Sequence, residues 1–194
     1  MAKSQMMVSE EAYFLREATG TSAVAETART VAAALAHHEI PHLVTGGLAV
    51  QEYGYPRVTT DVDIIVPDVL EAAEFGTADL SSALVRVPTI QDRLQDRRTG
   101  VMIDLLPAGR VLKSGCKVPF PMPEFSRDLL QFVRLEDLIS LKLDSWSNTP
   151  LHRLRDKTDV VELILRRQLP RNLVIQPVVR GIYLEIWDAL QAEK

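Results

Sequence analysis

The sequence predicts an α/β (α+β) protein with a short mixed β-sheet flanked by helices and followed by a helical carboxyl-terminal segment. Three observations predict this class. A glycine pair, Gly46-Gly47, follows an apolar run and precedes a stretch with helical character. The β-branched run at residues 61–66 is typical of a strand, and two further apolar runs flank a polar turn, as in a hairpin. From residue 135 onward, apolar residues recur mostly at helical spacing.

The composition is that of an ordinary globular protein, with 194 residues, 46% hydrophobic residues and a net charge of -4. This length predicts one domain, or one domain with a small helical appendage. We divide the chain into amino-terminal helices (1–39), a core (40–134) and a carboxyl-terminal helical segment (135–194). The net charge predicts no strong affinity for polyanions. The single cysteine, Cys116, excludes a disulfide within the chain and fits a reducing compartment. Because there is no membrane-length apolar run and no signal-peptide pattern, we expect a cytoplasmic protein without membrane contact.

Two helices are predicted before the first strand, within residues 9–39. Ser9 is a suitable N-cap for the first helix, because two glutamates follow it. Gly20 separates it from the second helix, which ends near His37-His38. Consecutive helical positions do not face one another, so the two histidines favour a solvated helix end over a metal site. The chain then enters a strand at residues 42–44.

Two aspartates alternate with aliphatic residues in the next predicted strand. Asp61 and Asp63 project to the same face, with their Cα atoms roughly 6.6 Å apart. Carboxylates this close repel each other beside an aliphatic run, and a divalent cation with oxygen ligands offsets the repulsion. The preceding Gly46 and Gly47 let the backbone approach a ligand, and a helix starting there would offer unpaired N–H groups to phosphate. Alone, a glycine pair is more often a tight turn, so the prediction depends on both features together.

The pattern between residues 67 and 134 predicts a helix, an ambiguous stretch, a hairpin, a long connection and a last strand. The helix is 69–75, capped by Asp68, and the ambiguous stretch is 76–89, with a candidate helix at 78–84 and a candidate strand at 84–87. The hairpin strands are 90–95 and 101–106 around a polar turn, the connection is 107–128 with a short strand at 111–112, and the last strand is 131–134. The second hairpin strand carries Asp104. A buried acid is costly without a partner, so Asp104 is paired, exposed or bound to metal, and the residues alone favour a structural role.

Three helices are predicted in the carboxyl-terminal segment, at 135–145, 150–167 and 177–190. Lys142 lies beside the apolar face of the first. Between His152 and Arg171, six basic residues stand against three acidic ones. This excess is either a solvated helix face with i,i+4 pairs or a basic border of a binding cleft.

The stretch from Val44 to Asp63 resembles the signature of the nucleotidyltransferase superfamily that includes DNA polymerase beta. That signature is an apolar residue, Gly-Gly or Gly-Ser, a short spacer, and Asp-apolar-Asp. The segment Gly54-Tyr55-Pro56-Arg57-Val58-Thr59-Thr60-Asp61-Val62-Asp63 is similar to a pattern of small bacterial members related to abortive-infection toxins. Leu141-Lys142-Leu143 and the Arg-x-x-Asp pattern at Arg153 resemble helices that border the cleft in that branch. The resemblance covers residues 40–168.

The resemblance implies a nucleotidyltransferase fold and transfer of a nucleoside monophosphate from a nucleoside triphosphate to an acceptor hydroxyl. It implies that Asp61, Asp63 and Asp104 bind Mg²⁺ or Mn²⁺ and carry catalysis, with Asp104 arriving from a neighbouring strand. The residues implied to bind nucleotide are Gly46, Gly47, Arg57, Thr60, Lys142 and Lys157. The acceptor is left open between an RNA end, a protein side chain and a small molecule such as an aminoglycoside.

A second hypothesis is a non-catalytic interaction module that keeps this fold. Gly47 stands where many catalytic members carry a serine whose hydroxyl helps to hold the terminal phosphate. This departure favours a binding role, for example in a toxin–antitoxin pair with an antitoxin partner. The intact set of three carboxylates favours an enzyme instead.

Overall fold

The computed structural model describes residues 22–78, 83–88, 90, 92–126, 128 and 130–193. Within these residues the chain forms a five-stranded mixed sheet with the strand order β1-β2-β5-β4-β3. β2 and β5 are parallel, and the other neighbouring pairs are antiparallel. The strands are β1 (Leu43–Thr45), β2 (Asp61–Val66), β3 (Leu84–Arg86), β4 (Arg93–Asp96) and β5 (Met102–Pro107). The predicted class, an α/β protein built on a short mixed sheet, is confirmed.

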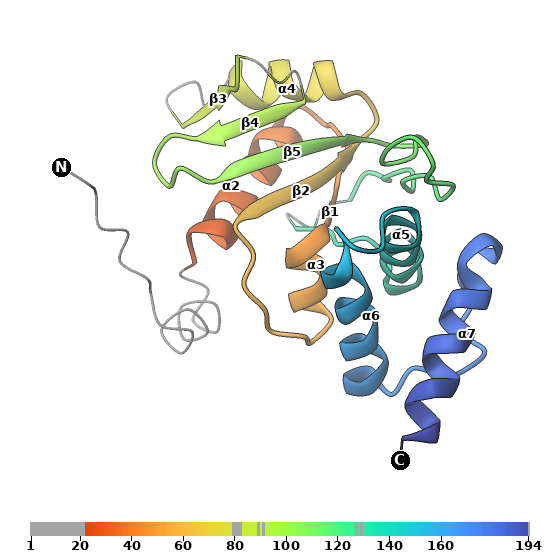
Figure 1. Cartoon of the computed structure of the whole chain (residues 1–194). Coiled ribbons are helices and arrows are strands. Elements are labelled where there is room, and N and C mark those ends of the chain that lie inside the picture. The colour runs from red at the N-terminus through yellow and green to blue at the C-terminus, as the bar shows by residue number, and fades with distance from the viewer. Residues whose placement is uncertain are drawn as a thin grey trace.

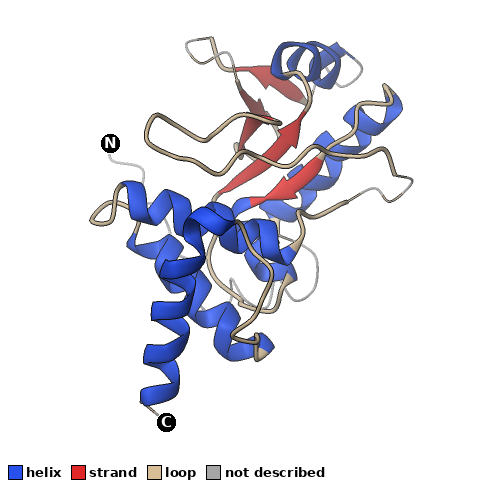
Figure 2. Ribbon diagram, turned by 90° about the vertical axis from the view of Figure 1, so that its right-hand side faces the viewer, coloured by secondary structure: helices blue, strands red, loops and turns tan. Residues whose placement is uncertain are grey.

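Helices flank the sheet and form a separate layer at the carboxyl-terminal end (Figures 1 and 2). α2 and α4 contact each other and the sheet, α3 connects β1 to β2, and α5 packs on both α6 and α7. The bounds are α2 (Ala23–His37), α3 (Gly46–Glu52), α4 (Val69–Ala78), α5 (Leu135–Asn148), α6 (Leu154–Arg167) and α7 (Pro177–Ala192). The predicted helical carboxyl-terminal segment is therefore confirmed.

The hydrophobic core divides along the two faces of the central strands. Ile64 joins residues of α2 in one buried cluster, whereas the next residue, Ile65, joins residues of α5, α6 and α7 in another. Successive strand residues point to opposite faces, so β2 supplies aliphatic side chains to both clusters. Asp61 and Asp63 share the face of Ile65. The carboxylates therefore lie on the side of the sheet that the carboxyl-terminal helices partly cover.

Side-chain caps define the first turns of α2 and α4. Ser22 Oγ accepts a hydrogen bond from the backbone N–H of Ala25 at 3.1 Å. The predicted cap Asp68 accepts two backbone hydrogen bonds in the same way, at 2.8 and 3.0 Å. Each such cap satisfies N–H groups without a helical partner and contributes about 1 kcal/mol. The helix predicted from Ser9 onward lies outside the described residues.

α6 begins later than predicted, at Leu154 instead of Pro150. The preceding residues form a turn in which the backbone N–H of His152 donates to the carbonyl of Thr149 at 3.1 Å. Because a residue before proline is disfavoured in the helical region, Thr149 starts a turn there instead of a helix. Arg153 consequently lies at the N-cap of α6, exposed to solvent.

The other connections agree with the sequence in part. The ambiguous stretch before the hairpin contains β3, which agrees with the candidate strand at 84–87. Most of the candidate helix at 78–84 lies outside the described residues. The strand predicted at 131–134 is wrong, because only an isolated parallel bridge joins Val44 to Phe132. In the long connection, the short strand predicted at 111–112 is likewise only an isolated bridge, between Val111 and Pro119.

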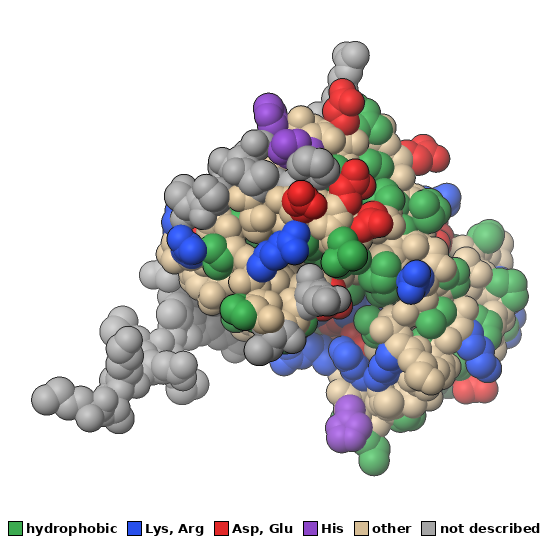
Figure 3. Space-filling model, turned by 90° about the horizontal axis from the view of Figure 1, so that it is seen from above, with side chains coloured by type: hydrophobic (Ala, Val, Ile, Leu, Met, Phe, Trp, Pro, Cys, Tyr) green, Lys and Arg blue, Asp and Glu red, His purple; other side chains and the backbone are tan. Residues whose placement is uncertain are grey.

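The surface carries both signs of charge. Seen from above, acidic side chains are most frequent in the upper part of the face, and basic ones are spread over its middle and lower parts (Figure 3). No large surface of one sign covers this view, which agrees with the small net charge. Within the described part of the chain, none of the helices combines the length and the hydrophobicity needed to span a membrane.

Candidate functional site

Three carboxylates lie on one face of the sheet, on the parallel strands β2 and β5. Asp63 of β2 is the register partner of Asp104 of β5, and Asp61 is two positions before Asp63. The pKa of Asp63 is raised to about 6, first by burial and then by the charges of Asp61 and Asp104. A carboxylate in such a field is stabilised by a nearby cation.

The glycine turn packs directly against these carboxylates. Gly46 begins α3 with a φ of 63°, a conformation that other residues seldom adopt. A Cβ atom at this position would lie only 1.8 Å from Oδ2 of Asp63. Both the backbone angle and the space therefore require glycine, and the main chain at Gly46 approaches the Asp63 carboxylate with no side chain between them.

Gly47 makes room for two side chains of the loop before β2. A Cβ at this residue would lie 2.3 Å from Thr59 Oγ1 and 3.0 Å from an Arg57 nitrogen. Thr59 is buried, and its hydroxyl donates to Oδ1 of Asp61 at 3.3 Å. Thr60, the residue selected from the sequence, is exposed. The hydroxyl that contacts the carboxylates is thus that of Thr59, which the sequence interpretation did not select.

Lys142 and Arg57 are joined through buried acids of α6. Lys142 Nζ lies 2.8 Å from Asp156 Oδ1 and 2.7 Å from Asp159 Oδ2. Arg57 Nε lies 2.9 Å from the other oxygen of Asp159, whose side chain is fully buried. These opposite charges offset one another's desolvation and tie α5, α6 and the loop before β2 together. The two cations also oppose the burial-driven rise in the pKa of Asp63, so they lie within the field of the site.

Asp63 and two residues of this ion network, Lys142 and Asp156, line a small cleft of about 110 Å³. Arg153, which the sequence interpretation did not select as a nucleotide ligand, also lines it. Ser145 lines it too, and its buried Oγ has no hydrogen-bond partner among the described residues. The apolar lining consists of Leu106, Leu112, Phe120, Leu138 and Leu141.

Asp104 has an ion-pair partner on the neighbouring strand. Arg93 of β4 is its register partner, and the guanidinium donates from Nε to one carboxylate oxygen and from an NH₂ group to the other at 2.9 Å. Counting back from the predicted turn at 96–100 places Asp92 opposite Asp104, whereas the observed register places Arg93 there. In the residues that the structure describes, no three His, Cys, Asp or Glu side chains are grouped closely enough to hold a metal ion.

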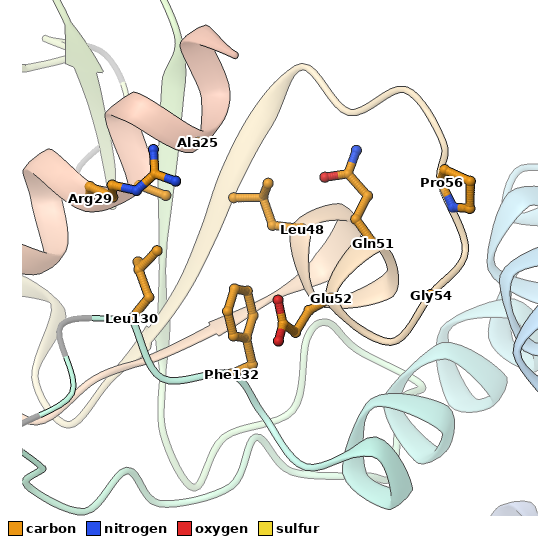
Figure 4. A pocket seen from close by; sticks show the side chains of 10 residues that line it. Ala25, Arg29, Leu48, Gln51, Glu52, Gly54, Pro56, Leu130 and Phe132 are labelled. Carbon is orange, nitrogen blue, oxygen red and sulfur yellow. The ribbon is translucent and has the colours of Figure 1, made fainter. Parts of the chain in front are cut away.

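Two further features lie apart from the cleft. Lys157 Nζ lies 4.7 Å from the centroid of the Trp146 ring, in a pocket lined by residues of α7, and so does not join the other residues predicted to bind nucleotide. A cavity of about 610 Å³ lies between α2, α3 and residues 130–132 (Figure 4). None of the residues predicted to bind metal or nucleotide lines this cavity. Gly54, from the motif that precedes β2, does line it.

No protein-family model matches the chain, and no curated protein sequence does. Two solved structures of ANT(2″)-Ia are similar to it. The solution structure of this antibiotic-resistance factor has a TM-score of 0.47 at 14% identity, covering 84% of this chain and 92% of that chain. A crystal structure in complex with adenylyl-2″-tobramycin has a TM-score of 0.49 at 12% identity, covering 84% and 97%. These likenesses concern the outline of the fold.

Proposed function

We propose that the protein is a metal-dependent nucleotidyltransferase that moves a nucleoside monophosphate from a nucleoside triphosphate to an acceptor hydroxyl. The observation that carries this proposal is the direct packing of Gly46 against Asp63, a carboxylate whose pKa is raised to about 6 by burial and by the neighbouring acids. Exposed backbone N–H groups suit phosphate, and crowded carboxylates suit a cation. A triphosphate with its divalent counter-cation supplies both charges at once.

The donor atoms fit a hard divalent cation. Asp61 and Asp63 offer carboxylate oxygens on one face of β2, and the pKa of Asp63, raised first by burial and then by the neighbouring acids, would be lowered by a bound cation. These two residues would hold Mg²⁺ or Mn²⁺, with Asp104 as a third ligand once its contact with Arg93 is exchanged. The bound cation would supply Lewis acidity and charge neutralisation at the phosphates.

The chain's own residues would divide the remaining work. The acceptor oxygen forms a bond to the α-phosphorus while the bond from that phosphorus to the leaving pyrophosphate breaks. Asp104 is suited to take the proton of the acceptor hydroxyl, and the N–H groups at Gly46 and Gly47 to hold the triphosphate. Lys142 and Arg57 are already paired, so they would act mainly by fixing α5 and α6 at the cleft.

The acceptor would be bound at the open side of the cleft. A volume of about 110 Å³ is small beside the roughly 300–1,000 Å³ of typical ligand pockets, so most of a nucleotide and its acceptor would extend beyond it. An RNA end, a protein hydroxyl and a small molecule such as an aminoglycoside are the acceptor classes to compare. The reaction needs nucleoside triphosphates, which is consistent with the cytoplasmic location expected from the sequence.

The test follows the nucleotide into an acceptor. The protein is incubated with Mg²⁺, an extract of its own source and each α-labelled nucleoside triphosphate, and label is measured in RNA, protein and small-molecule fractions. Asp61→Ala should abolish labelling while circular dichroism shows a retained fold. Asp68→Ala is the matched control, because Asp68 is an exposed helix cap outside the cleft, and it should leave labelling intact.

A non-catalytic interaction module is the second candidate. The pairing of Asp104 with Arg93 favours it, because the third carboxylate already has a counter-ion. Gly47, in place of a phosphate-binding serine, favours it as well. If the unmutated protein labels nothing with any nucleotide in its own extract, this candidate replaces the enzyme, and an antitoxin-like protein becomes the partner to seek.

A further inference from the structure

Arg93 occupies both oxygens of the carboxylate that the proposed reaction needs. It lies directly opposite Asp104 in the antiparallel β4–β5 pair, and two nitrogens of its guanidinium donate to the two carboxylate oxygens. Register partners on neighbouring strands point to the same face, so Arg93, Asp104 and Asp63 form one row across the sheet. The guanidinium therefore lies at the side of the carboxylate group, next to the position that a cation would take.

A divalent cation and the guanidinium cannot both use these oxygens freely. A bidentate pair takes up the carboxylate oxygens with a fixed geometry, and two positive charges a few ångströms apart repel each other.

The exposure of the pair makes it exchangeable. The Arg93 side chain is 36% exposed and that of Asp104 24%, whereas Asp159 and Lys142 in the neighbouring network are 0% and 9% exposed. An arginine on the open side of the sheet can swing into water without leaving a buried charge unpaired. The Lys142 network cannot open in that way, because its separation would strand charges in the interior.

We propose that Arg93 is a resident counter-ion that holds Asp104 in the metal-free protein and competes with the divalent cation for it. Arg93 thereby sets the affinity of the site for the metal and keeps the third carboxylate in place until the metal arrives. This inference rests on the proposed function, because it needs a cation site at Asp61 and Asp63. It assigns Arg93 a positioning role through Asp104, without contact to the reacting atoms.

The test measures metal binding alone, without nucleotide or turnover. Free Mn²⁺ is titrated by electron paramagnetic resonance against metal-free unmutated protein, Arg93→Met and Arg93→Lys. Removing a unit positive charge next to the site should tighten Mn²⁺ binding about tenfold in Arg93→Met. Arg93→Lys keeps the charge but loses the bidentate geometry, so it should lie between the two. It also keeps the proposal testable if Arg93→Met fails to fold.

One control variant and two contrary outcomes complete the Mn²⁺ titration. Arg97→Met removes the same charge from an exposed position of the same hairpin and should leave the Mn²⁺ affinity unchanged. Equal or weaker Mn²⁺ binding by Arg93→Met, with clear binding by the unmutated protein, would overturn the role of Arg93 and leave the metal site standing. If neither protein binds Mn²⁺, the metal-dependent function itself fails, and this inference fails with it.

Discussion

Two groups of acids border the cleft, and the protein balances their charges in opposite ways. On α6, Asp156 and Asp159 are buried, and both contact Lys142 at hydrogen-bond distance. On β2, Asp63 lies beside other acids, and its pKa rises to about 6 because burial and their charges outweigh the charges of Lys142 and Arg57. The first group is neutralised within the fold and holds helices in place. The second is left short of positive charge, which costs stability and favours a bound cation.

The largest loss of stability is expected when the two acids of α6 lose Lys142. Lys142→Met would leave Asp156 and Asp159 buried without their shared partner, and should lower the free energy of unfolding by about 3–5 kcal/mol. Urea unfolding measures this change. Lys157→Met is the matched control, since it removes only a contact with the Trp146 ring and should cost less than about 1 kcal/mol. Equal losses in the two variants would contradict the distinction.

Removing the charge of Asp63 on β2 should instead raise the free energy of unfolding. Asp63→Asn removes a repelling charge, so the metal-free protein should gain about 1–2 kcal/mol near pH 7, a figure reduced to allow for partial solvent access. Thermal unfolding should also lose most of its response to Mg²⁺. Asp156→Asn serves as the comparison and should destabilise the protein, because it takes a partner from Lys142. A stabilising Asp156→Asn would show that the two groups do not differ as proposed.

The pH dependence sharpens the same contrast. Unfolded Asp63 releases its proton near pH 3.8, whereas the folded protein holds it up to about pH 6. The folded state therefore binds more protons in this window, and the stability that Asp63 contributes is present below it and lost as the pH rises through it. The unfolding free energy of unmutated protein minus that of Asp63→Asn should fall between these pH values and level off above them. A difference independent of pH would argue against a raised pKa.

An exposed ion pair should give the smallest effect. Arg171 and Asp188 form a bidentate contact at 2.8 and 2.9 Å, yet both side chains are about half exposed. Solvent screening leaves little net stabilisation in such pairs, so Arg171→Ala should change the urea midpoint by no more than the measurement error. This variant sets the baseline for the buried pairs. A clear loss of stability would mean that exposure is a poor guide to the worth of ion pairs in this protein.

The strand chemistry of the site could be predicted from the sequence because its signals are local. Alternation places Asp61 and Asp63 on one face of β2, and the glycine pair marks the turn that packs on them. The predicted hairpin was correct, but its register differs by one residue, because Asp96 belongs to β4 and not to the turn; this shift places Arg93 opposite Asp104. These features depend on neighbours in the chain or on one short turn.

The helical side of the site could not be predicted in the same way. The contact of Arg57 with Asp159 joins residues about a hundred positions apart and depends on how α6 packs on α5. The choice between Thr59 and Thr60 depends on a single-residue difference in the loop before β2, which decides which hydroxyl turns inward. Lys157 was predicted to bind nucleotide because its segment resembles a pattern of the small bacterial nucleotidyltransferases. In the folded chain its ammonium group lies over the Trp146 ring.

The close approach of Gly46 to Asp63 restricts how this sequence can vary. Any side chain at position 46 would occupy space that the Asp63 carboxylate fills, so such a replacement is tolerable only if residue 63 becomes smaller. A variant that keeps the glycine can still lose the acid, whereas a variant that loses the glycine must lose the acid too. Among natural relatives, a residue other than glycine at position 46 should therefore accompany the loss of the acid at residue 63.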